Sequence, residues 1–335
     1  MKTSGRFTAE EFLVAAEFER TPVKQPEPEP PRAAPSRIGR IAVYLAIATI
    51  FSTFFSGVLA WEPLSLLLGP AWQYQTLMPV RQAILANWVS GLQFALALMA
   101  ILVAHEFGHY ILTRVYKVPS TPPLFIPFPI ISPIGTMGAV ILMQSGSADR
   151  KQIFDIGLAG PLAGLVVAIP VIAYGILNPA PLPYTADDSI TLFIGQPLLV
   201  QWMAMWLAPD QANEYVFVAN SSVSPFLMAG WVGLLVTGIN MMPMGQLDGG
   251  HVTFGLVGEK SYWIARGAMF SAIAFMIYNQ VLMFALMLVL VYLMGLKHPP
   301  SSDDSKSLGF LRQAVGWASL TLPILCIPAR PLVAF

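Results

Sequence analysis

Long apolar runs, separated by short polar segments, dominate the chain from residue 41 onward. A helix needs about 20 predominantly apolar residues to cross the hydrocarbon core of a bilayer. Several segments approach this length, and the last of them is the weakest. The pattern therefore predicts an α-helical multi-span membrane protein with six or seven transmembrane helices: Ile41–Trp61, Ala83–Ala104, Ile156–Leu177, Pro225–Met242, Ile264–Tyr278, Val281–Leu296 and the weaker Phe310–Ile327.

Two further apolar regions lack a helical pattern. Pro119–Gln144 contains six prolines, and proline neither continues a helix nor occupies a central strand. Its second half, Gly135–Gln144, is strand-like, so we expect a short β-hairpin or loop near the cytoplasmic face. The segment 178–222 is apolar over Leu192–Leu207 and is expected to lie along the outer surface of the membrane.

Lysine and arginine orient the predicted spans, because they concentrate in cytoplasmic loops. Segment 178–222 has none, whereas the segments before the first span and after the second, fourth and sixth spans do. We therefore expect a multi-pass protein, interpreted as one of the bacterial cytoplasmic membrane, with its N-terminus in the cytoplasm. The basic residues used are Arg32, Arg37, Arg40, Arg114, Lys117, Arg150, Lys151, Lys260, Lys297, Lys306 and Arg312, with Arg330 an exception if the seventh span exists.

The first 40 residues differ in composition from the rest. They contain no continuous apolar segment of the kind found in a cleaved signal peptide, and six glutamates argue against a transit peptide. Thr21–Pro35 alternates proline with glutamate, which is typical of an extended linker. We predict a disordered cytoplasmic tail over residues 1–40 and a membrane domain over 41–335 with its core at 83–255.

The amino-acid composition limits the partners and metal sites that the chain can have. Hydrophobic residues make up 56% of the chain and charged residues 11%, against about 25% charged in a soluble domain. The net charge is zero and no basic cluster stands out, so we expect no nucleic-acid partner. The single cysteine, Cys326, excludes a disulfide framework and a thiolate zinc site. Metal-binding imidazoles must come from four histidines, His105, His109, His251 and His298.

The segment His105-Glu106-Phe107-Gly108-His109 continues the second predicted span. Residues i and i+4 share one face of a helix, so the two imidazoles are placed to bind one divalent ion, with Glu106 in reach of water at that ion. Zinc, one per chain, is the expected ion. His105 lies nine residues before Arg114, about 13 Å below the headgroups, where ionisable residues are usually functional.

A catalytic zinc usually has a third protein ligand. Three residues lie near cytoplasmic ends of spans: Asp155, Asp248 and His251. Asp248 is favoured, because the fourth span ends at Pro243 and Gly249-Gly250 lets the backbone turn sharply. Asp155 is interpreted as the N-cap of the third span. Two interpretations of His251 stay open: it holds a ligand in place, or it bridges the turn.

Three segments resemble the site-2 protease family of intramembrane zinc metalloproteases, in its cyanobacterial and plastid-type branch without a PDZ domain. They are His105–His109, Phe154–Gly164 and Asn240–Gly249, and the strand-like Gly135–Ala139 is also similar. The resemblance implies metal ligands at His105, His109 and Asp248, with Glu106 as general base. It also implies that Asn240 polarises the scissile carbonyl. Many members have Asn where this chain has Gly164, so a polar role there is not implied.

The expected function is zinc-dependent cleavage of a transmembrane segment of another membrane protein. A helix hides its carbonyls in hydrogen bonds, so the substrate must unwind, and Gly135–Gln144 either pairs with it as an edge strand or only packs on the helices. Two alternatives remain open. A metal-binding transporter predicts zinc flux, but no internal repeat supports it. A non-catalytic scaffold predicts a closed four-ligand site with His251 as the extra ligand.

Overall fold

A computed structural model of the 335-residue chain describes residues 36–61, 75–180, 192–219, 223–279, 284–330 and 332–334. The chain divides into two units, Met1–Pro35 and Ser36–Phe335. The first unit holds most of the predicted N-terminal tail and lies outside the described residues. The last part of that predicted tail, from Ser36, is already helical.

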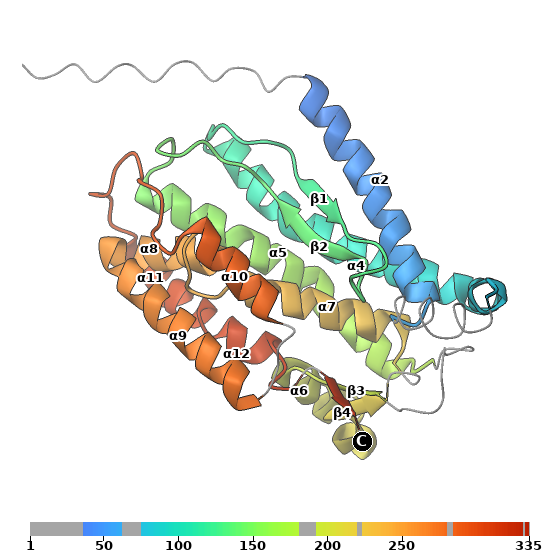
Figure 1. Ribbon diagram of the computed structural model, residues 1–335. Coiled ribbons are helices and arrows are strands. Elements are labelled where there is room, and N and C mark those ends of the chain that lie inside the picture. Colours follow the sequence, from blue (N-terminus) through green and yellow to red (C-terminus); the bar gives the residue numbers. More distant parts are fainter. Residues whose placement is uncertain are drawn as a thin grey trace, which may run out of the picture. The chain divides into compact units, whose positions relative to one another are not determined.

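Among the described residues, three helices are long and apolar enough to cross a membrane. They are α2 (Ser36–Val58), α4 (Met78–Val115) and α5 (Arg150–Leu177). Helices α4 and α5 contain the second and third predicted spans, and α2 covers the first except for its last three residues. The 38 residues of α4 extend about 57 Å, well beyond a hydrocarbon core of about 30 Å. In Figure 1, α2 packs on α4, and α4 and α5 run through the centre of the unit.

The remaining predicted spans correspond to shorter helices. The fourth is the 16-residue α7 (Pro225–Asn240), and the fifth and sixth are α9 (Ser261–Asn279) and the 10-residue α10 (Ala285–Met294). The expected turn between the latter two lies partly outside the described residues, since Gln280 is not among them. The structure therefore supports a multi-helix membrane protein, and the count of six or seven crossings stays a prediction.

The weaker candidate for a seventh span, Phe310–Ile327, is not one continuous helix. The segment forms α11 (Gly309–Ser319) and α12 (Leu322–Cys326). The break precedes Pro323, which lacks the amide hydrogen needed to continue α11 and fits the first turn of a new helix.

A two-stranded antiparallel hairpin forms where the proline-rich region was predicted to contain one. Strand β1 (Leu124–Pro127) pairs with β2 (Thr136–Val140), with a register shift between Phe125 and Pro127. The turn end of the hairpin is fixed to α2, because Ser52 Oγ donates to the Gly135 carbonyl at 2.5 Å and Ser56 donates to the Pro133 carbonyl.

The segment 178–222 is more structured than the sequence suggested, although 181–191 and 220–222 lie outside the described residues. It contains β3 (Leu192–Gly195), α6 (Leu198–Leu207), the 3₁₀ helix η2 (Pro209–Tyr215) and β4 (Phe217–Ala219). Strand β3 pairs on one side with β4 and on the other with β5 (Leu332–Ala334). The resulting three-stranded sheet was not predicted.

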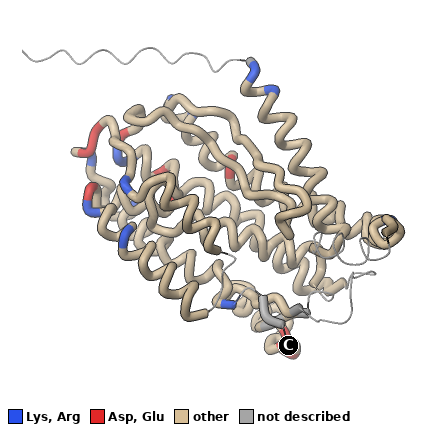
Figure 2. The backbone as a smooth tube through the Cα atoms, viewed as in Figure 1, with Lys and Arg blue, Asp and Glu red and all other residues tan. Residues whose placement is uncertain are grey.

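The largest hydrophobic core lies where α4, α5 and α7 meet. Its fully buried side chains include Phe94, Leu98 and Ile101 of α4, Ile172 of α5 and Leu234 of α7. Charged residues collect at helix ends and loops, and few lie along the long helices (Figure 2). This distribution is expected for helices whose outer surfaces face lipid.

The N-terminus of α5 is capped by Asp149, so the interpretation of Asp155 as the N-cap is wrong. The Asp149 side chain accepts from the Gln152 amide, and the Gln152 side chain accepts from the Asp149 amide. Helix α5 begins at Arg150, almost two turns before the apolar span predicted from Ile156, because polar residues such as Lys151 and Gln152 are also helical. Asp155 instead binds Arg312 of α11 at 2.7 and 3.0 Å and accepts from the Tyr116 hydroxyl at 2.6 Å.

We predict that Asp149→Ala lowers the free energy of unfolding by about 1–2 kcal/mol, because it removes the cap and the partner of Lys306. Burial raises the pKa of Asp149, but hydrogen bonds from Lys306 and the Gln152 amide outweigh it and hold the pKa below its usual value. A lowered pKa contributes stability above about pH 4 that is lost as the pH falls through the folded-state pKa. Thermal unfolding in detergent at pH 7 and at acidic pH measures this difference, and exposed Asp210→Ala is the matched control.

Candidate metal centre

Helix α4 brings two imidazoles together near its C-terminal end. His105 and His109 are one turn apart, their ring centroids are 5.1 Å apart, and both residues are buried. His109 Nδ1 lies 2.7 Å from the Ile156 carbonyl of α5, and a carbonyl only accepts hydrogen bonds. Nδ1 therefore carries the proton, and neutral His109 keeps its lone pair on Nε2.

Asp248 reaches the same point from a distant part of the chain. It is the first residue of α8 (Asp248–Val257), which follows the irregular segment after α7. Its Oδ2 lies 3.2 Å from His105 Nε2 and 3.3 Å from His109 Nε2. The lone pair of His109 Nε2 thus faces a carboxylate oxygen. Two electron-rich atoms repel one another, and a cation bound by both would remove this repulsion.

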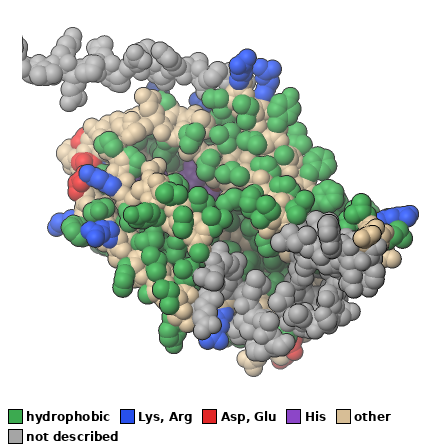
Figure 3. Space-filling view, viewed as in Figure 1, with side chains coloured by type: hydrophobic (Ala, Val, Ile, Leu, Met, Phe, Trp, Pro, Cys, Tyr) green, Lys and Arg blue, Asp and Glu red, His purple; other side chains and the backbone are tan. Residues whose placement is uncertain are grey.

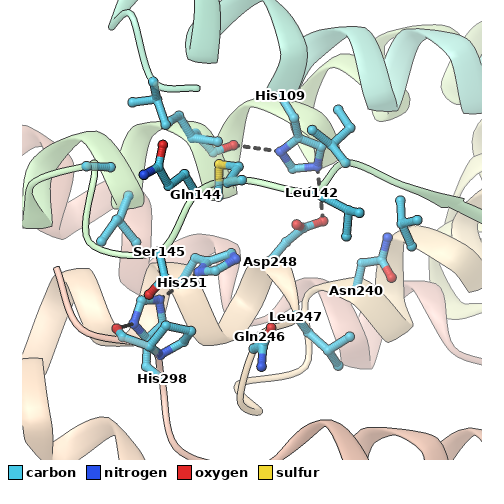
Figure 4. Close-up of a pocket in the computed structure, with 18 of the residues that line it drawn as sticks. His109, Leu142, Gln144, Ser145, Asn240, Gln246, Leu247, Asp248, His251 and His298 are labelled. Carbon is cyan, nitrogen blue, oxygen red and sulfur yellow. Dashed lines mark hydrogen bonds and ion pairs between the residues drawn. The ribbon is translucent and has the colours of Figure 1, made fainter. Parts of the chain in front are cut away.

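These donor atoms fit zinc. One ligand atom from each of His105, His109 and Asp248 lies within 4.8 Å of the other two. Two imidazole nitrogens and one carboxylate oxygen are a donor set of catalytic zinc sites, which leave a fourth position open. In Figure 4, His109 and Asp248 point toward one another across the cavity.

Glycines allow the helices around the centre to approach closely. A β-carbon at Gly160 of α5 would lie 2.0 Å from His109 Nε2, and one at Gly164 would lie 3.2 Å from His105 Nδ1. At the start of α8, a β-carbon at Gly249 would lie 2.1 Å from the Met241 carbonyl oxygen. These glycines thus let the backbone of α5 lie against His105 and His109, and that of α8 against Met241 at the end of α7.

Asn240 and Glu106 complete the set of residues singled out from the sequence. Asn240 is the last residue of α7, and its Nδ2 lies 3.3 Å from His105 Nε2. Glu106 is buried and lines the same cavity as the two histidines. All five candidate residues therefore border one cavity: His105, Glu106, His109, Asn240 and Asp248.

The cavity has a volume of about 340 Å³ and is bordered by the hairpin as well as by the helices. Ala139–Gly146, which includes the end of β2, lines it. In Figure 3, a histidine surface is visible in a hollow of an otherwise largely hydrophobic face. The cavity is thus open enough to be seen from outside the molecule.

Comparison with known proteins identifies the family. The model of peptidase family M50 matches residues 93–290, which include His105, Glu106, His109, Asn240 and Asp248. The chain belongs to peptidase family M50. The resemblance to site-2 proteases is thereby confirmed.

Curated relatives of this M50 chain are named as zinc metalloproteases. The probable zinc metalloprotease EGY1, chloroplastic, of Oryza sativa subsp. japonica is 33% identical over 58% of this chain and 31% of its own length. The probable zinc metalloprotease EGY2, chloroplastic, of Arabidopsis thaliana is 29% identical over 53% of this chain and 31% of its own. The chain thus spans about a third of the length of these relatives. No solved structure matches it significantly.

Asp155 and His251, the two other residues weighed as ligands, contact different partners. Asp155, considered as a ligand, is bound to Arg312 and Tyr116 instead. His251 Nδ1 lies 2.7 Å from His298 Nε2, and both residues line the cavity. Sequence reasoning missed His298, because it lies 47 positions after His251 and its only signal was being one of four histidines.

Proposed function

We propose that this chain is an intramembrane zinc-dependent endopeptidase that cuts a transmembrane segment of another membrane protein. The observation that carries this proposal is the convergence of Asp248 with His105 and His109, which lie beside Glu106 in a helix long enough to span the bilayer. A structural zinc site would be closed by four ligands, whereas among the described residues one ligand atom from each of three residues meets here.

The proposed roles follow from position. His105, His109 and Asp248 hold zinc, which when bound polarises a carbonyl and makes water nucleophilic at neutral pH. Glu106, next to the first ligand, accepts the proton of the attacking water and passes it to the leaving amine. Asn240 Nδ2 donates a hydrogen bond to the scissile carbonyl oxygen as negative charge develops on it.

We propose that the substrate unwinds and pairs with the extended segment Ile141–Gln144, which follows β2 and lines the cavity. The Thr121 amide donates to the Leu142 carbonyl, and the Gln144 amide donates to the Pro119 carbonyl. Backbone groups alternate in direction along a strand, so those of Ile141 and Met143 are directed to the opposite side. That side is suited to adding one extended substrate strand by backbone hydrogen bonds.

The proposed topology has six or seven crossings in a bacterial cytoplasmic membrane, with the N-terminus and the metal centre toward the cytoplasm. The asymmetry of lysine and arginine supports this orientation. The exposed apolar side chains of α2, α4 and α5 support contact with lipid, among them Tyr44, Phe51, Leu96 and Val166.

Zinc removal is expected to abolish cleavage, because its ligands alone do not activate water at neutral pH. The purified chain, reconstituted with a transmembrane reporter, is treated with a chelator and then titrated with zinc while fragments are identified by mass spectrometry. Cleavage should return as zinc approaches one ion per chain. Zinc bound without any peptide product would favour the scaffold, and zinc flux across vesicles would favour the transporter.

A further inference from the structure

A pair of histidines outside the metal triad lines the cavity. His251 lies in the first turn of α8, and His298 lies in the segment after α10. Their ring centroids are 4.9 Å apart, and His298 also stacks on Phe254 with the ring planes 7° apart. Figure 4 shows the His251 ring between His298 and Asp248.

A chain of hydrogen bonds fixes which nitrogen of His251 carries its proton. His298 Nδ1 lies 2.6 Å from the Pro299 carbonyl oxygen, which only accepts, so this Nδ1 is protonated. The neutral His298 ring then has its lone pair on Nε2, which accepts from His251 Nδ1 at 2.7 Å. Neutral His251 therefore keeps a lone pair on Nε2, on the side of the ring away from His298.

Two observations support this arrangement. Burial lowers the pKa of His298, which favours its neutral form. Helix α5 also holds His251 in position, because a β-carbon at Gly157 would lie 2.7 Å from the His251 β-carbon. His251 is thus a fixed hydrogen-bond acceptor at the cavity wall, one helical turn from Asp248.

An unwound substrate needs such an acceptor. Away from water, a backbone N–H that is left unpaired destabilises the bound substrate. Pairing with one strand satisfies only alternate residues of the substrate, because the backbone groups of the others are directed to the opposite side. The metal ligands and Glu106 are committed to other roles, so an additional acceptor in the cavity would stabilise the unwound substrate.

We propose that His251 Nε2 accepts a hydrogen bond from a substrate backbone N–H beside the scissile bond, and that His298 is a positioning residue that fixes the required tautomer. This inference rests on the proposed peptidase function. A purely structural pair would only tie the segment after α10 to α8. Other bonds already hold that segment, because Gln246 donates to the Met294 carbonyl and the Ser302 amide donates to the Ala148 carbonyl.

The tautomer is measured without any activity. Full-length zinc-loaded protein is labelled with ¹⁵N-histidine, and its four histidines are assigned by single substitutions. We expect His251 and His298 to carry the proton on Nδ1. In His298→Phe, which keeps a ring to stack on Phe254, His251 should lose this preference. A proton on Nε2 of His251 in the unsubstituted protein would overturn the proposal.

The substrate contact is measured with synthetic transmembrane peptides in which one amide at a time is replaced by an ester, which lacks the N–H. At one position, the ester should raise KM about 3- to 10-fold relative to the all-amide peptide for the unsubstituted enzyme. For His251→Leu, the same ester should leave KM unchanged. His251→Gln, which retains an acceptor, should keep the dependence. Equal ester penalties in His251→Leu and the unsubstituted enzyme would overturn the contact. If no peptide is cut by the zinc-loaded enzyme, the proposed function itself fails, whereas the tautomer result stands separately.

Discussion

Glu106→Gln is expected to slow cleavage about 10²- to 10⁴-fold, the usual contribution of a general base. Glutamine has nearly the same shape as glutamate but cannot accept the proton of the attacking water. Glu106 is buried beside His105 and His109 and lines the cavity, so its carboxylate is placed to act on water there. Turnover of a reporter helix by equal amounts of zinc-loaded enzyme measures the effect.

The zinc content of Glu106→Gln should stay at one ion per chain, because the ligand atoms come from His105, His109 and Asp248. Asp248→Asn provides the comparison, since it removes a charged ligand and should lose both zinc and turnover. Turnover by Glu106→Gln within a few-fold of the unsubstituted enzyme would remove Glu106 from the role of base. Loss of zinc in that variant would assign Glu106 to metal binding instead.

The metal centre could be predicted from sequence because its geometry is mostly local. Histidines four positions apart share a helix face in any fold, so His105 and His109 needed no tertiary information. Asp248 was harder: a broken span and Gly249-Gly250 favoured it, and the family resemblance implied it. The glycine pair proved necessary because the backbone of Met241 lies against Gly249.

The sequence predictions that failed concern contacts between segments far apart in the chain. The strands β3, β4 and β5 have only three or four residues each, and their pairing joins positions near 193 and 333. Such short strands carry no clear alternation of polar and apolar residues. Asp155 was assigned to a cap because the basic residue that binds it, Arg312, is 157 positions away.

The largest effect on zinc affinity expected outside the ligands is that of Gly160→Ala. The added methyl group would lie 2.0 Å from His109 Nε2, the atom that faces Asp248. The imidazole has little freedom to move, because its Nδ1 is bound to the Ile156 carbonyl of the same helix as Gly160. Either His109 turns out of the site or α5 moves away from α4. We therefore expect zinc affinity to fall at least about 10- to 100-fold, as when the support of a metal ligand is lost.

Gly267→Ala is the matched control for this variant, because Gly267 lies within α9 and a β-carbon there meets no atom within 4 Å. Zinc titration and thermal unfolding of the metal-free chains separate the two ways in which Gly160→Ala can act. A displaced ligand lowers zinc affinity while leaving the metal-free melting temperature nearly unchanged, whereas separated helices lower both. Zinc affinity equal to that of Gly267→Ala would mean that His109 does not bind zinc through Nε2. The close contact of α5 with the centre would then serve packing alone.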